Sequence, residues 1–128
     1  MKLNVMFTIA AVYGVLNGLA ALLIPATILS MGGFPASSGV LMLTRFMGVA
    51  NLGLGLIAWL VRNAEASKVR DAVTLGFTVF FALHALTSLY GQFTDTSTSG
   101  HWVMATLQGL IAVGFFMAGR AGMSAKTS

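Results

Sequence analysis

Residues Val40–Val61 read VLMLTRFMGVANLGLGLIAWLV, residues Arg62–Asp71 read RNAEASKVRD, and residues Ala72–Gly91 read AVTLGFTVFFALHALTSLYG. The hydrocarbon core of a bilayer is about 30 Å thick, so a helix that rises 1.5 Å per residue needs roughly 20 apolar residues to cross it. Both apolar stretches have this length, and a helix satisfies its own backbone polar groups in lipid. The short polar connection between them favours antiparallel neighbours.

Two further stretches have the same length and character, one on either side of this central pair. The four predicted spans are about Val5–Ile24, Val40–Val61, Ala72–Gly91 and Trp102–Gly119. We therefore expect an all-α fold, a four-transmembrane-helix antiparallel bundle that forms a single membrane domain over residues 1–128. Pro25 ends the first span, and a serine at the end of Pro35–Ser38 is placed to cap the second. The connection Pro25–Ser38 is itself apolar, and we expect it to lie at the outer interface.

The composition excludes several classes of protein. The chain is 57% hydrophobic and only 8% charged, whereas about a quarter of the residues of a soluble domain are charged. The net charge of +4 comes without a basic run or an aromatic–basic platform, so no nucleic-acid partner is expected. There is no cysteine, which excludes disulfides, thiol catalysis and thiolate metal sites.

The basic residues predict the orientation of the chain in the membrane. The predicted outer connections Pro25–Ser38 and Gln92–Gly100 carry no Lys or Arg. By the positive-inside rule, the basic ends predict that both termini are cytoplasmic. The first span is too long for the core of a signal peptide and holds Tyr13 and Asn17, so we expect it to be retained. The basic residues that flank the spans are Lys2, Arg62, Lys68, Arg70, Arg120 and Lys126.

Arg45 is the basic residue that lies inside a span, and no Asp or Glu lies within any span. Each of the four helices contributes a polar residue at a depth of about 10 Å from its outer end. Helical spacing adds neighbours on the same faces and places Phe77, Phe80 and Phe81 deeper, so we expect an outward-opening polar cup over an aromatic floor. The predicted ligand-binding residues are Arg45, His84, Asn17, Gln108, Tyr13 and Thr87.

Each of these polar residues also has a simpler interpretation. A charged side chain at a helix centre costs about 2.5–3.5 kcal/mol on insertion scales. Arg45 therefore either extends to the outer headgroups, holds an anionic or strongly polar group of a ligand, or pairs with an acid on another subunit. His84 and the amides of Asn17, Asn51 and Gln108 are also suited to hydrogen bonds between helices.

The functional prediction is a small non-enzymatic membrane protein. It binds a lipid or hydrophobic ligand in the outer half of the bundle, or it serves as an accessory subunit of a larger membrane complex. Its expected partners are membrane lipid and another membrane subunit or a second copy. The absence of acids from the spans argues against an ion-coupled transporter, and no catalytic residue, cofactor or metal site is predicted. Two alternatives stay open: a membrane enzyme with His84 as base and Arg45 steadying an oxyanion, or an oligomeric channel.

One stretch also carries a resemblance to known proteins. Leu43-Thr44-Arg45-Phe46-Met47-Gly48, then Leu52-Gly53-Leu54-Gly55-Leu56 and the basic loop, resemble small bacterial four-helix membrane proteins of unknown function, loosely like the DoxX group. The resemblance covers the whole chain in topology. It implies a four-helix bundle in a bacterial inner membrane and supplies no catalytic residues.

Overall fold

The computed structural model describes residues 2–94 and 100–124, and for residues 122–124 only the backbone. Within these ranges the chain forms helices and no strand, which confirms the predicted all-α fold. Residues 95–99 of the predicted connection Gln92–Gly100 and Lys126 lie outside the described residues. The helices are α1 (Leu3–Leu23), α2 (Pro25–Met31), α3 (Ser38–Val61), α4 (Lys68–Thr94) and α5 (Gly100–Ser124).

Four of these helices, α1, α3, α4 and α5, are long and apolar enough to cross a membrane. Their outward-facing surfaces carry large apolar side chains such as Leu23, Phe93 and Leu60, each at least 70% exposed. An apolar surface of this extent is incompatible with water but suits contact with acyl chains. The chain is therefore a multi-pass membrane protein built as a four-helix bundle.

Helix α4 extends at both ends beyond the predicted span Ala72–Gly91, into polar residues. The first turn of α4 contains Asp71, whose negative charge favours the N-terminal end of a helix dipole. Ser67 Oγ accepts a hydrogen bond of 3.2 Å from the Arg70 backbone N–H and caps this end. Ser37 occupies the cap position of α3 as predicted, but its side chain makes no capping hydrogen bond.

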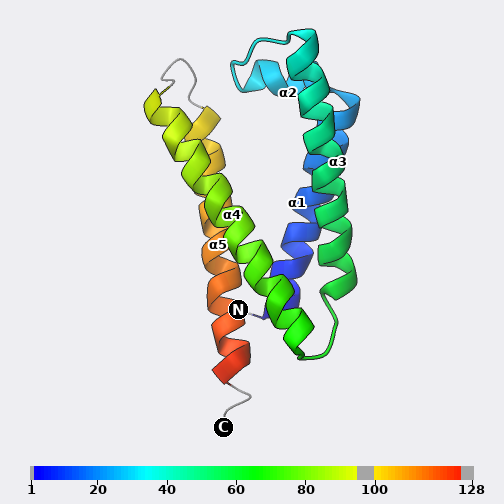
Figure 1. Cartoon of the computed structure of the whole chain (residues 1–128), viewed down its shortest axis with the longest axis vertical. Helices are drawn as coiled ribbons and strands as arrows, with labels where there is room; N and C mark the ends of the chain where they lie inside the picture. The colour runs from blue at the N-terminus through cyan, green and yellow to red at the C-terminus, as the bar shows by residue number, and fades with distance from the viewer. Residues whose placement is uncertain (1, 95–99, 125–128) are drawn as a thin grey trace.

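Helix α2 forms within residues Pro25–Ser38, which the sequence predicts to be a connection. Pro25 is its first residue, where the missing N–H of proline costs nothing. It ends at Met31, and two residues later Gly33 has a φ of 76°, in the left-handed region that favours glycine. Phe34 N–H then donates a hydrogen bond of 2.9 Å to the Leu29 carbonyl, and Leu29 is buried. Figure 1 shows that α2 lies across the end of the α1–α3 pair.

The four long helices form two pairs, α1 with α3 and α4 with α5. In Figure 1 the two pairs approach each other in the half near the termini and diverge toward the end that carries α2. Glycines bring α1 and α3 together. A Cβ atom on Gly14 would lie 2.7 Å from the Asn51 carbonyl oxygen, and one on Gly18 would lie 2.8 Å from the Gly48 carbonyl oxygen.

An aromatic core joins the two pairs where they meet. Phe7 of α1 is fully buried and packs edge-on against Phe77 of α4 and Phe115 of α5, with ring centroids 5.8 and 5.2 Å away. Phe77 and Phe115 stack at 5.4 Å, and Phe81 lies 6.2 Å from each of them. Aromatic pairs in these arrangements contribute about 0.5–1.5 kcal/mol beyond their burial. This cluster closes one half of the bundle and leaves the other half open.

Candidate ligand-binding cavity

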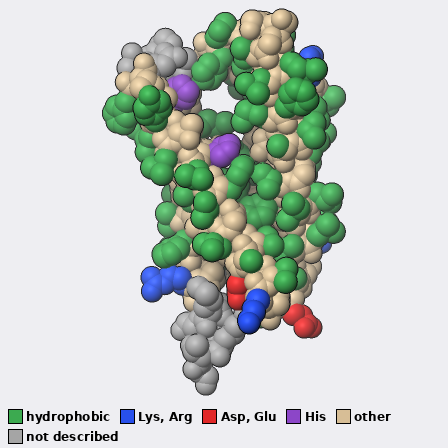
Figure 2. Space-filling view, viewed as in Figure 1, with side chains coloured by type: hydrophobic (Ala, Val, Ile, Leu, Met, Phe, Trp, Pro, Cys, Tyr) green, Lys and Arg blue, Asp and Glu red, His purple; other side chains and the backbone are tan. Residues whose placement is uncertain are grey.

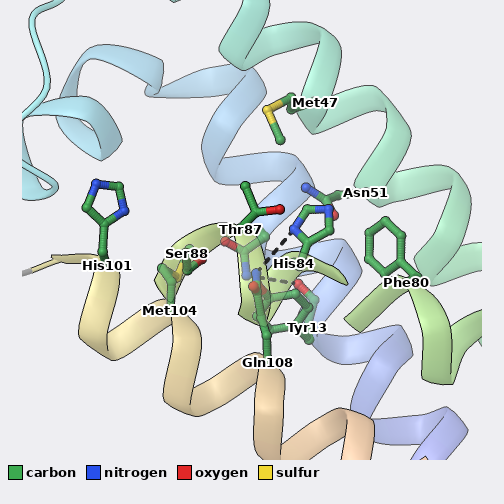
Figure 3. A pocket seen from close by; sticks show the side chains of 11 residues that line it. Tyr13, Met47, Asn51, Phe80, His84, Thr87, Ser88, His101, Met104 and Gln108 are labelled. Atoms are coloured by element: carbon green, nitrogen blue, oxygen red, sulfur yellow. Dashed lines mark hydrogen bonds between the residues drawn. The ribbon is translucent and has the colours of Figure 1, made fainter. Parts of the chain in front are cut away.

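A cavity of about 410 Å³ lies between the two helix pairs, in the half where they diverge. Figure 2 shows it as a hollow in the surface beside the histidine side chains. All four long helices line it, and Figure 3 shows their side chains. The lining residues are Tyr13 and Asn17 of α1, Met47 and Asn51 of α3, Phe80, His84, Thr87 and Ser88 of α4, and His101, Met104 and Gln108 of α5.

The structure brings five of the six predicted site residues together around this cavity. They are Tyr13, Asn17, His84, Thr87 and Gln108. Arg45 is exposed and does not line the cavity. Met47, which does line it, follows Arg45 by two residues, and at 3.6 residues per turn this separation rotates Arg45 by about 200° around α3. Because of this rotation, the Arg45 side chain lies on a face of α3 that does not line the cavity.

Gln108 links three helices at the bottom of the cavity. Its Nε2 donates a hydrogen bond of 3.1 Å to Tyr13 Oη, which connects α5 to α1. The same nitrogen lies 3.5 Å from His84 Nδ1 on α4, a longer and weaker contact. An amide nitrogen only donates, so His84 accepts at Nδ1 and carries its proton on Nε2 in this arrangement. Figure 3 shows the Gln108 amide between the two side chains.

The carbonyl oxygen of the Gln108 side chain, Oε1, has no partner among the described residues. Gln108 is only 5% exposed, and its Oε1 is buried without a hydrogen bond to any described residue. Leaving a buried acceptor unpaired costs about 1–3 kcal/mol. This acceptor, at a cavity lined by other polar groups, favours a bound molecule that donates a hydrogen bond.

Of the rings predicted for the floor of the cavity, Phe80 lines it, whereas Phe77 and Phe81 do not. The His84 and Phe80 ring centroids are 4.4 Å apart, and the Tyr13 ring packs edge-on against Phe81 at 5.8 Å. Phe81 also belongs to the aromatic core. The Tyr13 and Phe81 side chains therefore tie the polar layer to the most buried part of the bundle.

The rim of the cavity near α2 includes His101, which is not among the predicted site residues. Its ring packs edge-on against Phe34, which follows α2, at a centroid distance of 5.4 Å. A Cβ atom on Gly91 would lie 3.0 Å from the same ring, so the absence of a side chain there makes room for it. The contact between Phe34 and His101 connects the two helix pairs at the end of the cavity near α2.

Other lining residues were also missed, for identifiable reasons. Ser88 lies one helical turn after His84, on the same face of α4, and also lines the cavity. It is not among the predicted site residues. Met47 and Asn51 are four residues apart and share a face of α3. Arg45 lies on a different face of this helix, which does not line the cavity. The i, i+4 spacing of Met47 and Asn51 was the available signal.

Asn17 lies four residues after Tyr13, one helical turn along α1. Its Nδ2 donates a hydrogen bond of 3.3 Å to the Tyr13 backbone carbonyl one turn earlier. Both side chains line the cavity. The bond lies within one helix, so it orients Asn17 without connecting α1 to a neighbour.

Comparison with protein-family models, curated proteins and solved structures finds no match for this chain. The resemblance to the DoxX group therefore stays an expectation from the sequence. The cavity is the basis for a functional proposal.

Proposed function

We propose that this protein binds a lipid or a lipid-like amphipathic molecule in the cavity between its two helix pairs. The observation that carries the proposal is the convergence of polar side chains from all four long helices on one cavity. Unpaired polar groups are costly in a membrane domain. A bound head group compensates this cost, above all at the buried Gln108 Oε1.

The size and position of the cavity suit a head group with a chain attached. Its volume of about 410 Å³ is within the range of about 300–1,000 Å³ for small-molecule sites. The hollow opens at the surface between the helix pairs (Figure 2). A lipid can therefore place its head beside the polar side chains while its chain stays among the acyl chains of the bilayer.

Filling the cavity tests this proposal. Asn51→Trp inserts a large side chain from α3, and Thr87→Trp inserts one from α4. Val49→Trp is the matched control, because Val49 is 58% exposed on α3 and does not line the cavity. Lipid that co-purifies with each protein is quantified by mass spectrometry, after circular dichroism has shown that each variant is folded.

We expect both cavity variants to retain several-fold less of one lipid class than the wild-type protein and Val49→Trp. Equal lipid profiles in all four folded proteins would contradict the proposal.

We further propose that both termini face the cytoplasm of a bacterial cell and that the cavity lies in the outer half of the inner membrane. Lys2, Arg62, Lys68 and Arg70 flank α1, α3 and α4 at the end of the bundle where both termini lie (Figure 1), and Arg120 is near the end of α5. The segment that carries α2, at the opposite end, has no Lys or Arg. This asymmetry follows the positive-inside rule.

Single cysteines test this orientation cleanly, because the chain has none of its own. Thr27→Cys lies on α2 and Asn63→Cys lies between α3 and α4, and both positions are exposed. A membrane-impermeant maleimide is expected to label Thr27→Cys in intact cells and Asn63→Cys only after lysis. The reverse pattern would show the opposite orientation.

The accessory-subunit interpretation stays a second prediction from the sequence. Helix α3 has the least buried apolar stretch of the four spans, at 11% against 39% for α1, so it offers the most surface to a neighbouring protein. Cross-linking in native membranes from Met42→Cys on α3 is expected to capture a second protein if this role is correct. Capture of lipid alone would argue against it.

A further inference from the structure

The chemistry of the cavity lining identifies the kind of head group that fits. Among the described residues that line it, none is Lys, Arg, Asp or Glu. Burial of an ion without a partner of opposite charge is expensive in a medium of low dielectric constant. Arg45, which the sequence analysis associated with an anionic ligand, is exposed and away from the cavity. His84 and His101 also line the cavity, and His84 accepts from Gln108 Nε2 as a neutral ring in this arrangement. No described lining residue carries a permanent charge, so the lining disfavours a phosphate, a carboxylate or an ammonium group.

The polar groups that do line the cavity both donate and accept hydrogen bonds. Asn17, Asn51 and Gln108 carry amides, and Thr87 and Ser88 carry hydroxyls. Each amide has an acceptor oxygen and a donor nitrogen, and each hydroxyl donates once and accepts. A phosphate or carboxylate mainly accepts and an ammonium only donates, so each leaves part of such a lining unpaired. A hydroxyl group matches it, because it both donates and accepts.

Tyr13 and Gln108 provide a place for such a hydroxyl. Tyr13 Oη accepts from Gln108 Nε2 at 3.1 Å, so its own proton remains available to a ligand. Gln108 Oε1 is unpaired among the described residues. From standard amide geometry it lies no farther than roughly 5.4 Å from Tyr13 Oη, close enough for one hydroxyl oxygen to bond both. The oxygen is covered in this structure, so the inference requires the amide to turn about its last torsion, which is soft in Gln, when a ligand binds.

We infer that the cavity selects an uncharged amphiphile with a free hydroxyl in its head, bound by Tyr13 and Gln108. Diacylglycerols and long-chain alcohols belong to this chemical class. The inference rests on the proposed function, because it names the ligand class of the same cavity.

Three probes with the same 18-carbon chain separate the possible head groups. Oleyl alcohol donates and accepts, oleyl methyl ether only accepts, and oleyl phosphate is anionic at neutral pH. Each probe is titrated into purified protein, and bound probe is counted by native mass spectrometry. Asn51→Trp, with the cavity filled, measures non-specific attachment to the lipid-facing surface, which is subtracted.

We expect the wild-type protein to bind oleyl alcohol about tenfold more tightly than the ether, the effect of one hydrogen bond, and more tightly still than the phosphate. Tyr13→Phe keeps the ring that packs on Phe81 and removes only the hydroxyl. It is expected to reduce the binding of alcohol and ether alike, because Tyr13 Oη donates to the oxygen of either probe. Gln108→Met, a second variant of similar side-chain volume, is expected to reduce alcohol binding about tenfold and to leave ether binding unchanged, because only the alcohol donates to Gln108 Oε1.

Two results would overturn the inference and leave the proposed function standing. One is binding of the phosphate at least as tight as that of the alcohol, and the other is equal binding of alcohol and ether, in both cases lost in Asn51→Trp. A third result, in which every probe binds Asn51→Trp as well as the wild type, would overturn the proposed function and the inference with it.

Discussion

Gln108 on α5 and Tyr13 on α1 are 95 residues apart in sequence and are joined by a hydrogen bond of 3.1 Å across the bundle. Helix α1 belongs to one helix pair and α5 to the other. The bond therefore connects the two pairs directly beneath the cavity, and the aromatic core lies below it. Its position makes it both a structural link and a part of the proposed site.

The first prediction concerns the energy of this link. In a double-mutant cycle, Tyr13→Phe and Gln108→Met are expected to show a coupling of about 0.6 kcal/mol and at most about 1.7 kcal/mol, the average and the maximum found for hydrogen bonds between membrane helices. Unfolding in mixed micelles of mild detergent and SDS measures it. Tyr90→Phe is the control, because Tyr90 is 71% exposed. A coupling of zero would contradict the bond.

The second prediction concerns the contact between α1 and α3. Gly14→Ala places a Cβ atom 2.7 Å from the Asn51 carbonyl oxygen and 2.8 Å from Gly55 Cα. Both are backbone atoms, so the helices must separate, at an expected cost of about 1–3 kcal/mol. A Cβ atom on Gly53 meets nothing within 4 Å. Gly53→Ala is therefore expected to be neutral or stabilising, by up to about 1 kcal/mol. Equal effects of the two substitutions on unfolding in SDS would disprove the close packing.

The third prediction uses two neighbouring phenylalanines on α5. Phe115 is fully buried in the aromatic core and Phe116 is 52% exposed. Phe115→Ala is expected to destabilise the protein by about 3–5 kcal/mol through lost contacts and a cavity. Phe116→Ala is expected to cost less than about 1 kcal/mol. Thermal unfolding followed by circular dichroism compares them, and similar midpoints for the two variants would contradict the assigned core.

The sequence predicted the spans well, because the hydropathy and the length of a segment indicate whether it can cross the hydrocarbon core of a bilayer. It also predicted depth along each helix, which placed Tyr13, Asn17, His84, Thr87 and Gln108 in one layer. Rotation about a helix axis depends on packing against neighbours, and the sequence of α3 offered two polar faces. The close contact of Gly48 and Gly55 with α1 fixes that rotation.

The separation of the helices into two diverging pairs was not predicted either. Hydropathy is the same for a tight bundle and for one that opens at one end. The difference lies in which large rings meet. Phe7, Phe77, Phe81 and Phe115 hold the pairs together in one half, whereas the smaller and polar side chains in the other half leave space between them.

The fourth prediction concerns Arg45. Because its side chain is exposed and does not line the cavity, Arg45→Leu is expected to leave oleyl alcohol binding unchanged. Native mass spectrometry with the same probe measures the effect, beside Tyr13→Phe as the variant that weakens binding. A loss of binding in Arg45→Leu as large as that in Tyr13→Phe would place the arginine in the site.

The central claim is that the space between the helix pairs holds an amphiphile. An experimental density map of the protein purified with its native membrane lipids tests it most directly. The account predicts an elongated density whose polar end touches Gln108 and Tyr13 and whose chain leaves between the two pairs. An empty or collapsed cavity, with lipid density only on the outer surface around Arg45, would contradict it.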